Sequence, residues 1–315
     1  MTGPGGRSRS VDLTTSVGSV RLTNPVMTAS GTAGHGAELG RYVDLSSLGA
    51  VVVKSLSAEA WAGNPSPRVT EVDAGMLNSV GLQNPGVEAW LEDELPALVA
   101  PGARVVASIW GFTVEAYEKA AAALADAPAE VVAVEVNLSC PNIHGGRAIF
   151  AHDTRLVTEA VSASGACGRP RWAKLSPNVT NLTEIAGVAL EAGAEALTLI
   201  NTVMGMVIDP ETRRPKLGAG GGGLSGPAIR PVAVRAVYDV CTAFPDATVV
   251  GVGGVASGEH AVELLLAGAS AVQVGTATFA DPRAPARILG ELEGWCRRHR
   301  VARVADLVGK ARADA

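Results

Sequence analysis

Short apolar runs recur along the chain and alternate with segments of helical periodicity. Eight of these runs are rich in Val, Ile and Ala and are bounded by turn residues, so each predicts a β-strand. Most runs are continuously apolar, as in VVAVEVN, which is typical of parallel strands covered on both faces. The predicted strands are residues 25–29, 50–54, 104–108, 131–137, 171–175, 196–201, 248–252 and 271–275.

Helical periodicity appears between these strands. Apolar residues recur at three- and four-residue spacing, often behind a Thr, Asp or Asn cap, in residues 113–125, 153–163, 182–192, 228–244 and 258–267. Strands that alternate with helices over this length predict a (β/α)8 TIM barrel, with a doubly wound sheet as the alternative. Since no linker divides the chain, we expect a flexible N-terminus over residues 1–10 and one barrel domain over residues 11–315.

Four segments lie outside the strand and helix alternation. Residues 11–22 predict a β-hairpin before the first strand, and residues 296–312 predict a solvated amphipathic helix that closes the bottom of the barrel. Residues 55–101 and the Gly-rich residues 203–227 are long connections after the second and sixth strands. Long ordered connections after barrel strands usually build the active-site end, so we expect both there.

Composition narrows the class of protein. The chain has 315 residues, of which 47% are apolar and 18% charged, as in compact globular proteins. A net charge of -5 is a poor match to nucleic acid or anionic lipid. The first ten residues lack an apolar signal region, and no apolar run approaches the roughly 18 residues of a membrane span. We therefore expect a cytoplasmic protein without nucleic-acid or membrane partners.

The four cysteines contain no C-x-x-C pair, and the five histidines are scattered. This spacing fits a reducing compartment and excludes a self-contained cysteine-ligated zinc or iron-sulfur site. We expect no bound metal.

Polar residues and glycines gather where the predicted strands end. A single strand-end Lys or Asn is usually a rim charge or a turn residue, but all of these would share the functional face of a barrel. These positions are Ser30, Gly31, Lys54, Asn137, Lys174, Asn201, Gly253, Gly254, Gly275 and Thr276.

The turns after strands seven and eight, GVGGVASG and VGTATF, predict a phosphate site. Barrels commonly hold phosphate at this place through backbone N–H groups, and glycine allows close approach. GVGGVA also fits the G-x-G-x-x-A dinucleotide fingerprint, but the acidic residue expected about 20 positions later is missing. We therefore expect a phosphorylated ligand and no Rossmann unit.

Cys140 is the candidate for proton chemistry. It follows the fourth predicted strand among polar residues, and a thiol with an ordinary pKa of about 8.5 can serve as a general base if its neighbours favour the thiolate. His144 is an alternative. Cys167, Cys241 and Cys296 lack polar neighbours and are interpreted as buried, inert thiols.

Two lysines and four asparagines suit a planar anionic ligand. Lys54 and Lys174 would stabilise an anionic ring or a carboxylate, unless they only pair with carboxylates such as Glu135. Amides both donate and accept, which fits imide and carbonyl edges. The amides are those of Asn78, Asn137, Asn142 and Asn201.

Several motifs together resemble one family. NLSCPN, NSVGLQNPG, KLSPNVT, LINTVMGM, GGLSGPAIRP and GVGGVASG are similar to class 1 dihydroorotate dehydrogenases, from about residue 11 to the final helix. NSVGLQNPG and the stretch from LINTVMGM to GLSGPAI are closer to the NAD+-linked subclass 1B than to the fumarate-using 1A. The resemblance implies oxidation of (S)-dihydroorotate to orotate in UMP synthesis. It further implies an FMN-bearing catalytic subunit, homodimerised in a heterotetramer with an FAD and 2Fe-2S subunit that docks on an apolar patch near the flavin.

The resemblance also implies residue roles. Cys140 would take the C5 proton while the C6 hydride leaves for the flavin. The implied substrate contacts are Lys54, Asn78, Val80, Gly81, Leu82, Asn137, Asn142, Asn201 and Thr202. The implied FMN contacts are Ala29, Ser30, Gly31, Lys54, Asn137, Lys174 and Gly226, with the phosphate on Gly253, Gly254, Gly275 and Thr276.

Three features depart from the family pattern near the flavin pocket. Ser55-Leu56 stands where Gly-Thr is expected, Trp110 where a small residue is expected, and residues 218–223 are unusually rich in Gly. Two alternatives stay open: a 1A-like homodimer that reduces fumarate, and a noncatalytic barrel that binds a flavin or phosphate ligand.

Overall fold

Eight parallel strands form a nearly closed barrel. The computed structural model describes residues 10–138 and 150–312. The strands neighbour one another in chain order, which confirms the predicted (β/α)8 barrel and excludes a doubly wound sheet, whose strand order reverses. They are β3 (Val26–Thr28), β4 (Val51–Val52), β7 (Val105–Ile109), β8 (Val131–Asn137), β9 (Arg171–Leu175), β10 (Ala196–Leu199), β15 (Val249–Val252) and β16 (Ala271–Val274).

The seam between β3 and β4 closes through two backbone hydrogen bonds, Gly49 N–H to the Val26 carbonyl and Thr28 N–H to the Ala50 carbonyl, and through one side chain. Only an isolated bridge, Met27 to Ala50, joins the two strands. The Thr28 hydroxyl accepts from the Val52 backbone N–H at 2.8 Å and donates to the Val52 carbonyl at 3.2 Å. The hydroxyl therefore takes the place of a backbone partner at this seam.

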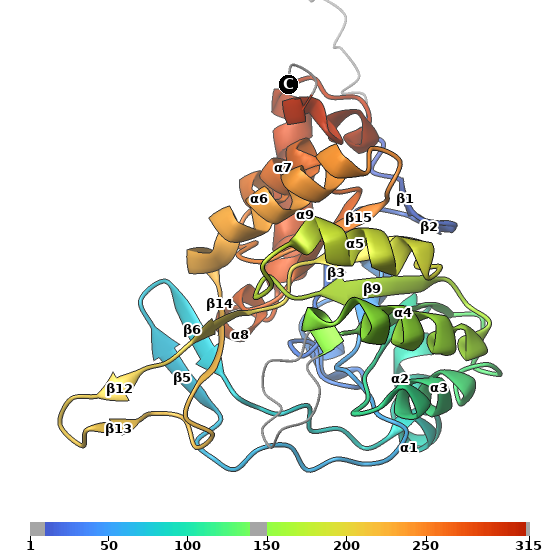
Figure 1. Cartoon of the computed structure of the whole chain (residues 1–315). Coiled ribbons are helices and arrows are strands. Elements are labelled where there is room, and N and C mark those ends of the chain that lie inside the picture. The colour runs from blue at the N-terminus through green and yellow to red at the C-terminus, as the bar shows by residue number, and fades with distance from the viewer. Residues whose placement is uncertain (1–9, 139–149, 313–315) are drawn as a thin grey trace, which may run out of the picture.

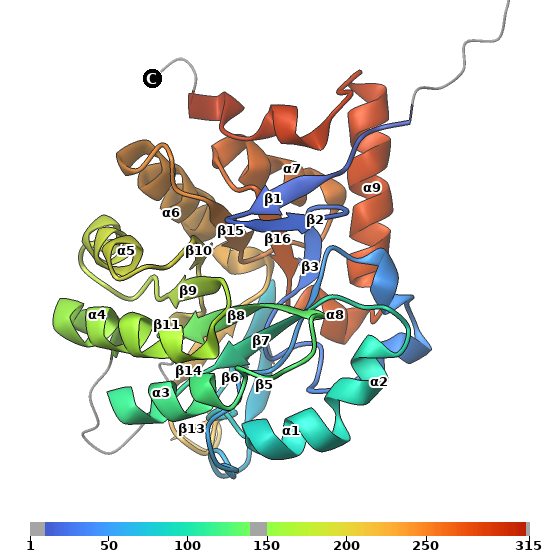
Figure 2. The ribbon, with the colours of Figure 1, turned by 90° about the vertical axis from the view of Figure 1, so that its right-hand side faces the viewer.

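Helices surround the strands, as Figure 2 shows. Three predicted caps are formed, because side chains at Thr113, Asp153 and Asn181 accept first-turn N–H groups. Ser257 caps α7 in the same way. The helices are α1 (Val87–Asp93), α2 (Leu95–Val99), α3 (Val114–Ala122), α4 (Thr154–Ala163), α5 (Leu182–Glu191), α6 (Arg230–Ala243), α7 (Gly258–Ala267), α8 (Ala277–Ala280) and α9 (Ala284–Arg298). No helix in the described ranges has the length and apolar character needed to cross a bilayer.

The predicted closing helix over residues 296–312 is wrong. Helix α9 ends at Arg298, Arg300 takes a left-handed φ of 58°, and two 3₁₀ turns follow. Val304 and Leu307 are buried on one face of the first of these turns, so this segment packs through a single short turn rather than along a helix. Residues 1–9 and 313–315 lie outside the described residues, and the domain limits stay a prediction.

The interior of the barrel changes character along its axis. Side chains alternate between the helix layer and the interior. At the N-terminal end the interior positions form one apolar cluster with the predicted hairpin, β1 (Thr15–Val17) and β2 (Val20–Leu22), which closes this end. Two residues further along, five of the strands place buried polar side chains in the interior: Ser108, Glu135, Lys174, Thr198 and Gln273.

The two long connections meet in a second sheet. β5 (Val69–Val72) and β6 (Gly75–Asn78) pair with β14 (Gly222–Ser225) and β11 (Val203–Gly205) in the antiparallel order β11-β14-β6-β5. β12 (Ile208–Asp209) and β13 (Arg214–Pro215) form an arm that extends beyond this sheet (Figure 1).

Close packing of this sheet explains the Gly-rich stretch. A Cβ at Gly222 would lie 2.4 Å from the Asn78 carbonyl oxygen, and one at Gly223 would lie 2.0 Å from Thr202 Oγ1. Larger residues at these two positions would therefore displace Asn78 and Thr202, both of which the sequence assigns to the substrate.

Candidate active site

A cavity of about 930 Å³ opens at the carboxyl ends of the barrel strands. This volume is in the range of small-molecule and cofactor sites. Cys140 and Asn142 lie outside the described residues, and their roles stay predictions. All the other predicted site residues line the cavity: Ala29, Ser30, Gly31, Lys54, Asn78, Val80, Gly81, Leu82, Asn137, Lys174, Asn201, Thr202, Gly226, Gly253, Gly254, Gly275 and Thr276.

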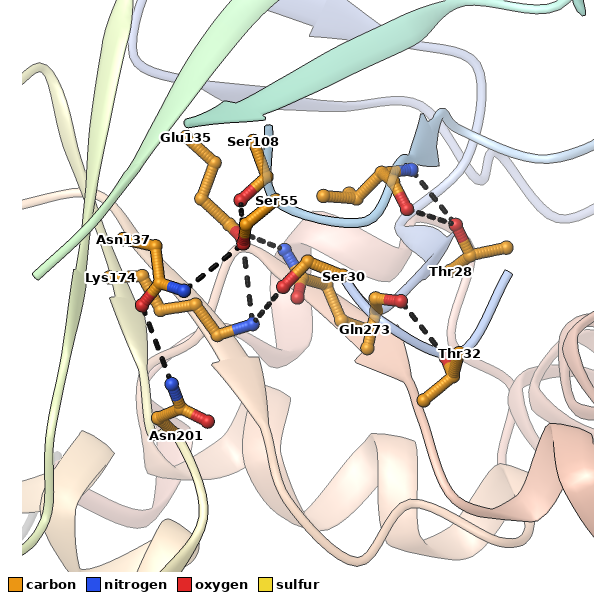
Figure 3. A network of polar contacts seen from close by, with 12 residues as sticks. Thr28, Ser30, Thr32, Ser55, Ser108, Glu135, Asn137, Lys174, Asn201 and Gln273 are labelled. Atoms are coloured by element: carbon orange, nitrogen blue, oxygen red, sulfur yellow. Dashed lines mark hydrogen bonds and ion pairs between the residues drawn. The ribbon is translucent and has the colours of Figure 1, made fainter. Parts of the chain in front are cut away.

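Amide groups are fixed to one another on the floor of this cavity (Figure 3). Asn201 Nδ2 donates to Asn137 Oδ1 at 3.4 Å, and Asn137 Nδ2 donates to Ser55 Oγ at 3.0 Å. Ser55 Oγ lies 2.9 Å from Ser108 Oγ. The departure at Ser55 therefore supplies a hydrogen bond that orients the Asn137 amide.

Lys174 is held between two oxygens. Its Nζ donates to Ser30 Oγ at 2.8 Å and lies 3.4 Å from Glu135 Oε1, while Gln273 Nε2 donates to Glu135 Oε2 at 2.7 Å. The suggested pairing with Glu135 is therefore correct for Lys174, yet Lys174 also lines the cavity. Lys174 therefore both pairs with Glu135 and lines the cavity.

An aromatic cluster supports the loop that carries Val80 and Gly81. Trp61 Nε1 donates to the Gly81 carbonyl at 3.0 Å. The Trp61 ring packs edge to face on Trp110 and Phe112, with centroids 6.4 and 5.1 Å away. The bulky residue at position 110 therefore braces the cavity wall from behind.

The Gly turns after β15 and β16 present backbone N–H groups to the cavity. Gly253 and Gly254 have φ values of 133° and 71°, which disfavour any residue with a Cβ. Among the described residues, no group accepts the backbone N–H of Gly254 or Thr276, and both residues line the cavity. Unpaired N–H groups at the end of a cavity of this volume fit a phosphate on a flavin-sized group.

The comparisons with known proteins now decide the family. The dihydroorotate dehydrogenase family model matches residues 12–295. The chain belongs to this family. A relative from Solibacter usitatus, named putative dihydroorotate dehydrogenase A (fumarate), is 49% identical over 298 residues, which cover 94% of this chain and 97% of the relative. A Geobacter sp. (strain M21) relative, named dihydroorotate dehydrogenase B (NAD(+)), catalytic subunit, is 46% identical over 299 residues, with 95% and 97% covered.

A solved structure confirms the fold. The Eimeria tenella dihydroorotate dehydrogenase, crystallised with ferulenol, superposes with a TM-score of 0.80 at 21% identity, covering 98% of this chain and 91% of that one. The predicted resemblance is confirmed, and the B-type names of several relatives agree with the predicted subclass. The chain is therefore an oxidoreductase that converts dihydroorotate to orotate in pyrimidine biosynthesis, and it belongs to a flavin-dependent family.

The sequence analysis did not predict the cavity residues that β5, β6 and the segment after β16 contribute. Only the general expectation that long connections line the site pointed towards β5 and β6. Ser55 was noticed as a departure and not as a site residue. The main additions to the lining are Thr32, Ser55, Val69, Thr70, Glu71, Val72, Gly75, Met76, Ser225, Phe279, Asp281 and Arg287.

The three cysteines in the described ranges are all buried. Burial raises the pKa of Cys167 and Cys296, and it raises that of Cys241 to about 11, so these thiols stay protonated. None of them lines the cavity. Across residues 10–138 and 150–312, no three His, Cys, Asp or Glu side chains are grouped to hold a metal.

His35, close to Lys54, should make stability depend on pH. Burial, aided by the Lys54 charge, lowers the pKa of His35 from 6.5 to about 4. Between these values the unfolded chain binds a proton that the folded chain does not, so stability is full above pH 6.5 and falls as the pH drops towards 4. We expect a loss of about 1–2 kcal/mol, reduced for the partial exposure of the ring.

Urea unfolding across this pH range measures the effect. His35→Asn should flatten the pH dependence, while His299→Asn, at an exposed position, should keep the wild-type slope. Equal slopes in all three proteins would show that His35 does not titrate differently in the folded state.

Proposed function

We propose that this chain oxidises dihydroorotate with FMN as the catalytic subunit of an NAD+-linked enzyme. The proposal rests on the set of groups that line one cavity. Free backbone N–H groups at Gly254 and Thr276, the Lys174 ammonium and linked amides at Asn137 and Asn201 all face the same space. This combination suits a phosphorylated redox cofactor beside a planar substrate.

FMN, when bound, supplies the acceptor for the hydride that leaves C6 of the substrate. The glycines at the ends of β15 and β16 would hold its phosphate. The ring would lie against Ala29, Ser30, Gly31, Lys54, Asn137, Lys174 and Gly226, which line the cavity between the barrel strands and the second sheet.

The substrate would lie against the amide side of the cavity. Asn78, Asn137 and Asn201 offer donors and acceptors to the imide edge, and the Lys54 ammonium offers a cation to the carboxylate. The backbone of residues 80–82, braced through Gly81, would close the remaining edge. Cys140 would take the C5 proton as general base, with Asn142 nearby in the chain.

Purified protein should be yellow, and dihydroorotate should bleach it under anaerobic conditions. The bleaching reports transfer of the hydride to the flavin without any external acceptor. Dihydrouracil, which lacks the carboxylate, serves as the control and should bleach far more slowly. A coloured protein that dihydroorotate does not bleach would support the noncatalytic flavin-binding alternative instead.

The apolar surface near the cavity supports an electron-transfer partner. Val69 and Phe279 line the cavity and are 53% and 58% exposed. Met204 is also exposed, and it lies in one row with Val69 across the second sheet, through Asn78 and Gly223. We propose that an FAD and 2Fe-2S subunit docks here in the cytoplasm, on homodimerised catalytic subunits within a heterotetramer.

The acceptor separates the two subclasses. The chain alone should turn over slowly with NAD+, and adding the electron-transfer subunit should restore the reaction. Full turnover of the chain alone with fumarate would favour the 1A-like alternative, whose name the Solibacter relative carries.

A further inference from the structure

A carboxylate lies beneath the floor of the cavity, and the reaction described above makes no use of it. Glu135 on β8 is fully buried and does not line the cavity. The next interior positions below it in the barrel are apolar, with Ala133 on the same strand and Trp172 on the neighbouring one. An isolated charge at this depth is costly, so its partners determine its state.

The partners of Glu135 form a chain that reaches the cavity (Figure 3). Oε2 accepts from Gln273 Nε2 at 2.7 Å, and Oε1 lies 3.4 Å from Lys174 Nζ. Lys174 Nζ in turn donates to Ser30 Oγ at 2.8 Å. An ammonium has three N–H donors, so one remains for a group inside the cavity.

Gln273 decides which member of the buried pair holds the proton. Its Nε2 can only donate, and that hydrogen bond stabilises the ionised carboxylate. Within the described part of the chain, Gln273 Oε1 has no hydrogen-bond partner, so nothing pulls the amide towards the reverse orientation. This hydrogen bond therefore favours a carboxylate at Glu135 facing an ammonium at Lys174, beside the cavity.

No other charged side chain in the described residues takes the place of Glu135 as the partner of Lys174. At the level of Glu135, strands β7, β10 and β16 contribute only the uncharged Ser108, Thr198 and Gln273. The remaining charged groups on the cavity lining are Lys54, Glu71, Asp281 and Arg287, and Arg287 lies 3.2 Å from Asp281 as an ion pair.

We propose that Glu135 and Gln273 are positioning residues that keep Lys174 protonated and so set the reduction potential of the bound flavin. The inference rests on the proposed function, since it needs a flavin in this cavity. Reduction adds negative charge to a flavin, and a fixed cation beside it stabilises the reduced form. Glu135 acts through Lys174 and touches neither flavin nor substrate.

The test is the flavin reduction potential of the holoprotein as a function of pH. In Glu135→Gln the ammonium has lost its counterion, so Lys174 should release its proton within the measured range. The ratio of reduced to oxidised flavin should then fall at least tenfold on the alkaline side, which is about 30 mV for a two-electron couple. Glu135→Asp keeps the charge and should follow the wild-type profile.

Three further variants separate positioning from folding. Lys174→Met and Lys174→Met/Glu135→Gln should have parallel profiles without the alkaline fall, because neither keeps an ammonium beside the flavin that could lose its proton. If Glu135→Gln does not fold, Gln273→Met should show a smaller shift in the same direction. A Glu135→Gln profile parallel to the wild type overturns the inference, as does a parallel Gln273→Met profile where only that variant folds.

The two proposals fail in different ways. Wild-type protein that retains no flavin, or is not bleached by dihydroorotate, refutes the proposed function. Wild-type protein that is bleached normally, with parallel potential profiles in the variants, refutes only the role of Glu135 and Gln273.

Discussion

Replacing Cys140 by serine should slow reduction of the flavin by dihydroorotate about 10²–10⁴-fold near neutral pH, the usual contribution of a general base. A hydroxyl is a far weaker acid than a thiol, so almost none of it is ionised to accept the C5 proton. Strand β8 ends at Asn137 on the cavity lining. The segment that leads to Cys140 therefore leaves β8 at the cavity.

Anaerobic stopped-flow reduction measures this step alone. The Cys140→Ser protein should retain its flavin and recover part of its rate as the pH rises. Cys167→Ser is the matched control, because Cys167 is buried and does not line the cavity, and it should reduce at the wild-type rate. An unchanged single-turnover rate in Cys140→Ser would remove this thiol from the mechanism.

Lys174→Met should lower the free energy of unfolding by about 3–5 kcal/mol, because breaking a buried ion pair leaves one charge uncompensated. The charge left behind is that of Glu135, whose side chain is fully buried. The same substitution removes the cation beside the cavity, so flavin retention should fall as well.

The double variant Lys174→Met/Glu135→Gln supplies the control. Removing both charges avoids an isolated ion, so chemical denaturation should show most of the lost stability regained, while flavin retention stays low. A single variant as stable as the wild type would mean that removing Lys174 does not leave an uncompensated buried charge at Glu135.

Local sequence patterns were sufficient for the barrel and for one face of its site. Strands β8 and β9 have the predicted bounds because continuous apolar runs flanked by turns leave little choice of register. Asn137 lies at the last position of β8 and Lys174 one before the end of β9, so their chain positions alone placed them at the cavity.

Local sequence patterns could not predict the pairing of strands that are far apart in the chain. The second sheet joins β6 to β14 through Leu77 and Leu224, residues far apart in the chain whose short, Gly-rich strands have no marked periodicity. Glu135 was named as a carboxylate that could pair with Lys54 or Lys174, but its second partner, Gln273, comes from a strand on another side of the ring and was not foreseen. Only coordinates bring these side chains together, and the role of Cys140 stays a prediction.

The Thr28 hydroxyl at the joint between β3 and β4 has a consequence for the width of the cavity. Ser30 and Lys54 each follow this joint by two residues, on opposite sides of it. Two backbone hydrogen bonds and this hydroxyl join β3 to β4, whereas most other neighbouring strands of the barrel share a longer ladder. Opening of this joint would therefore change the separation of Ser30 from Lys54, which both line the cavity.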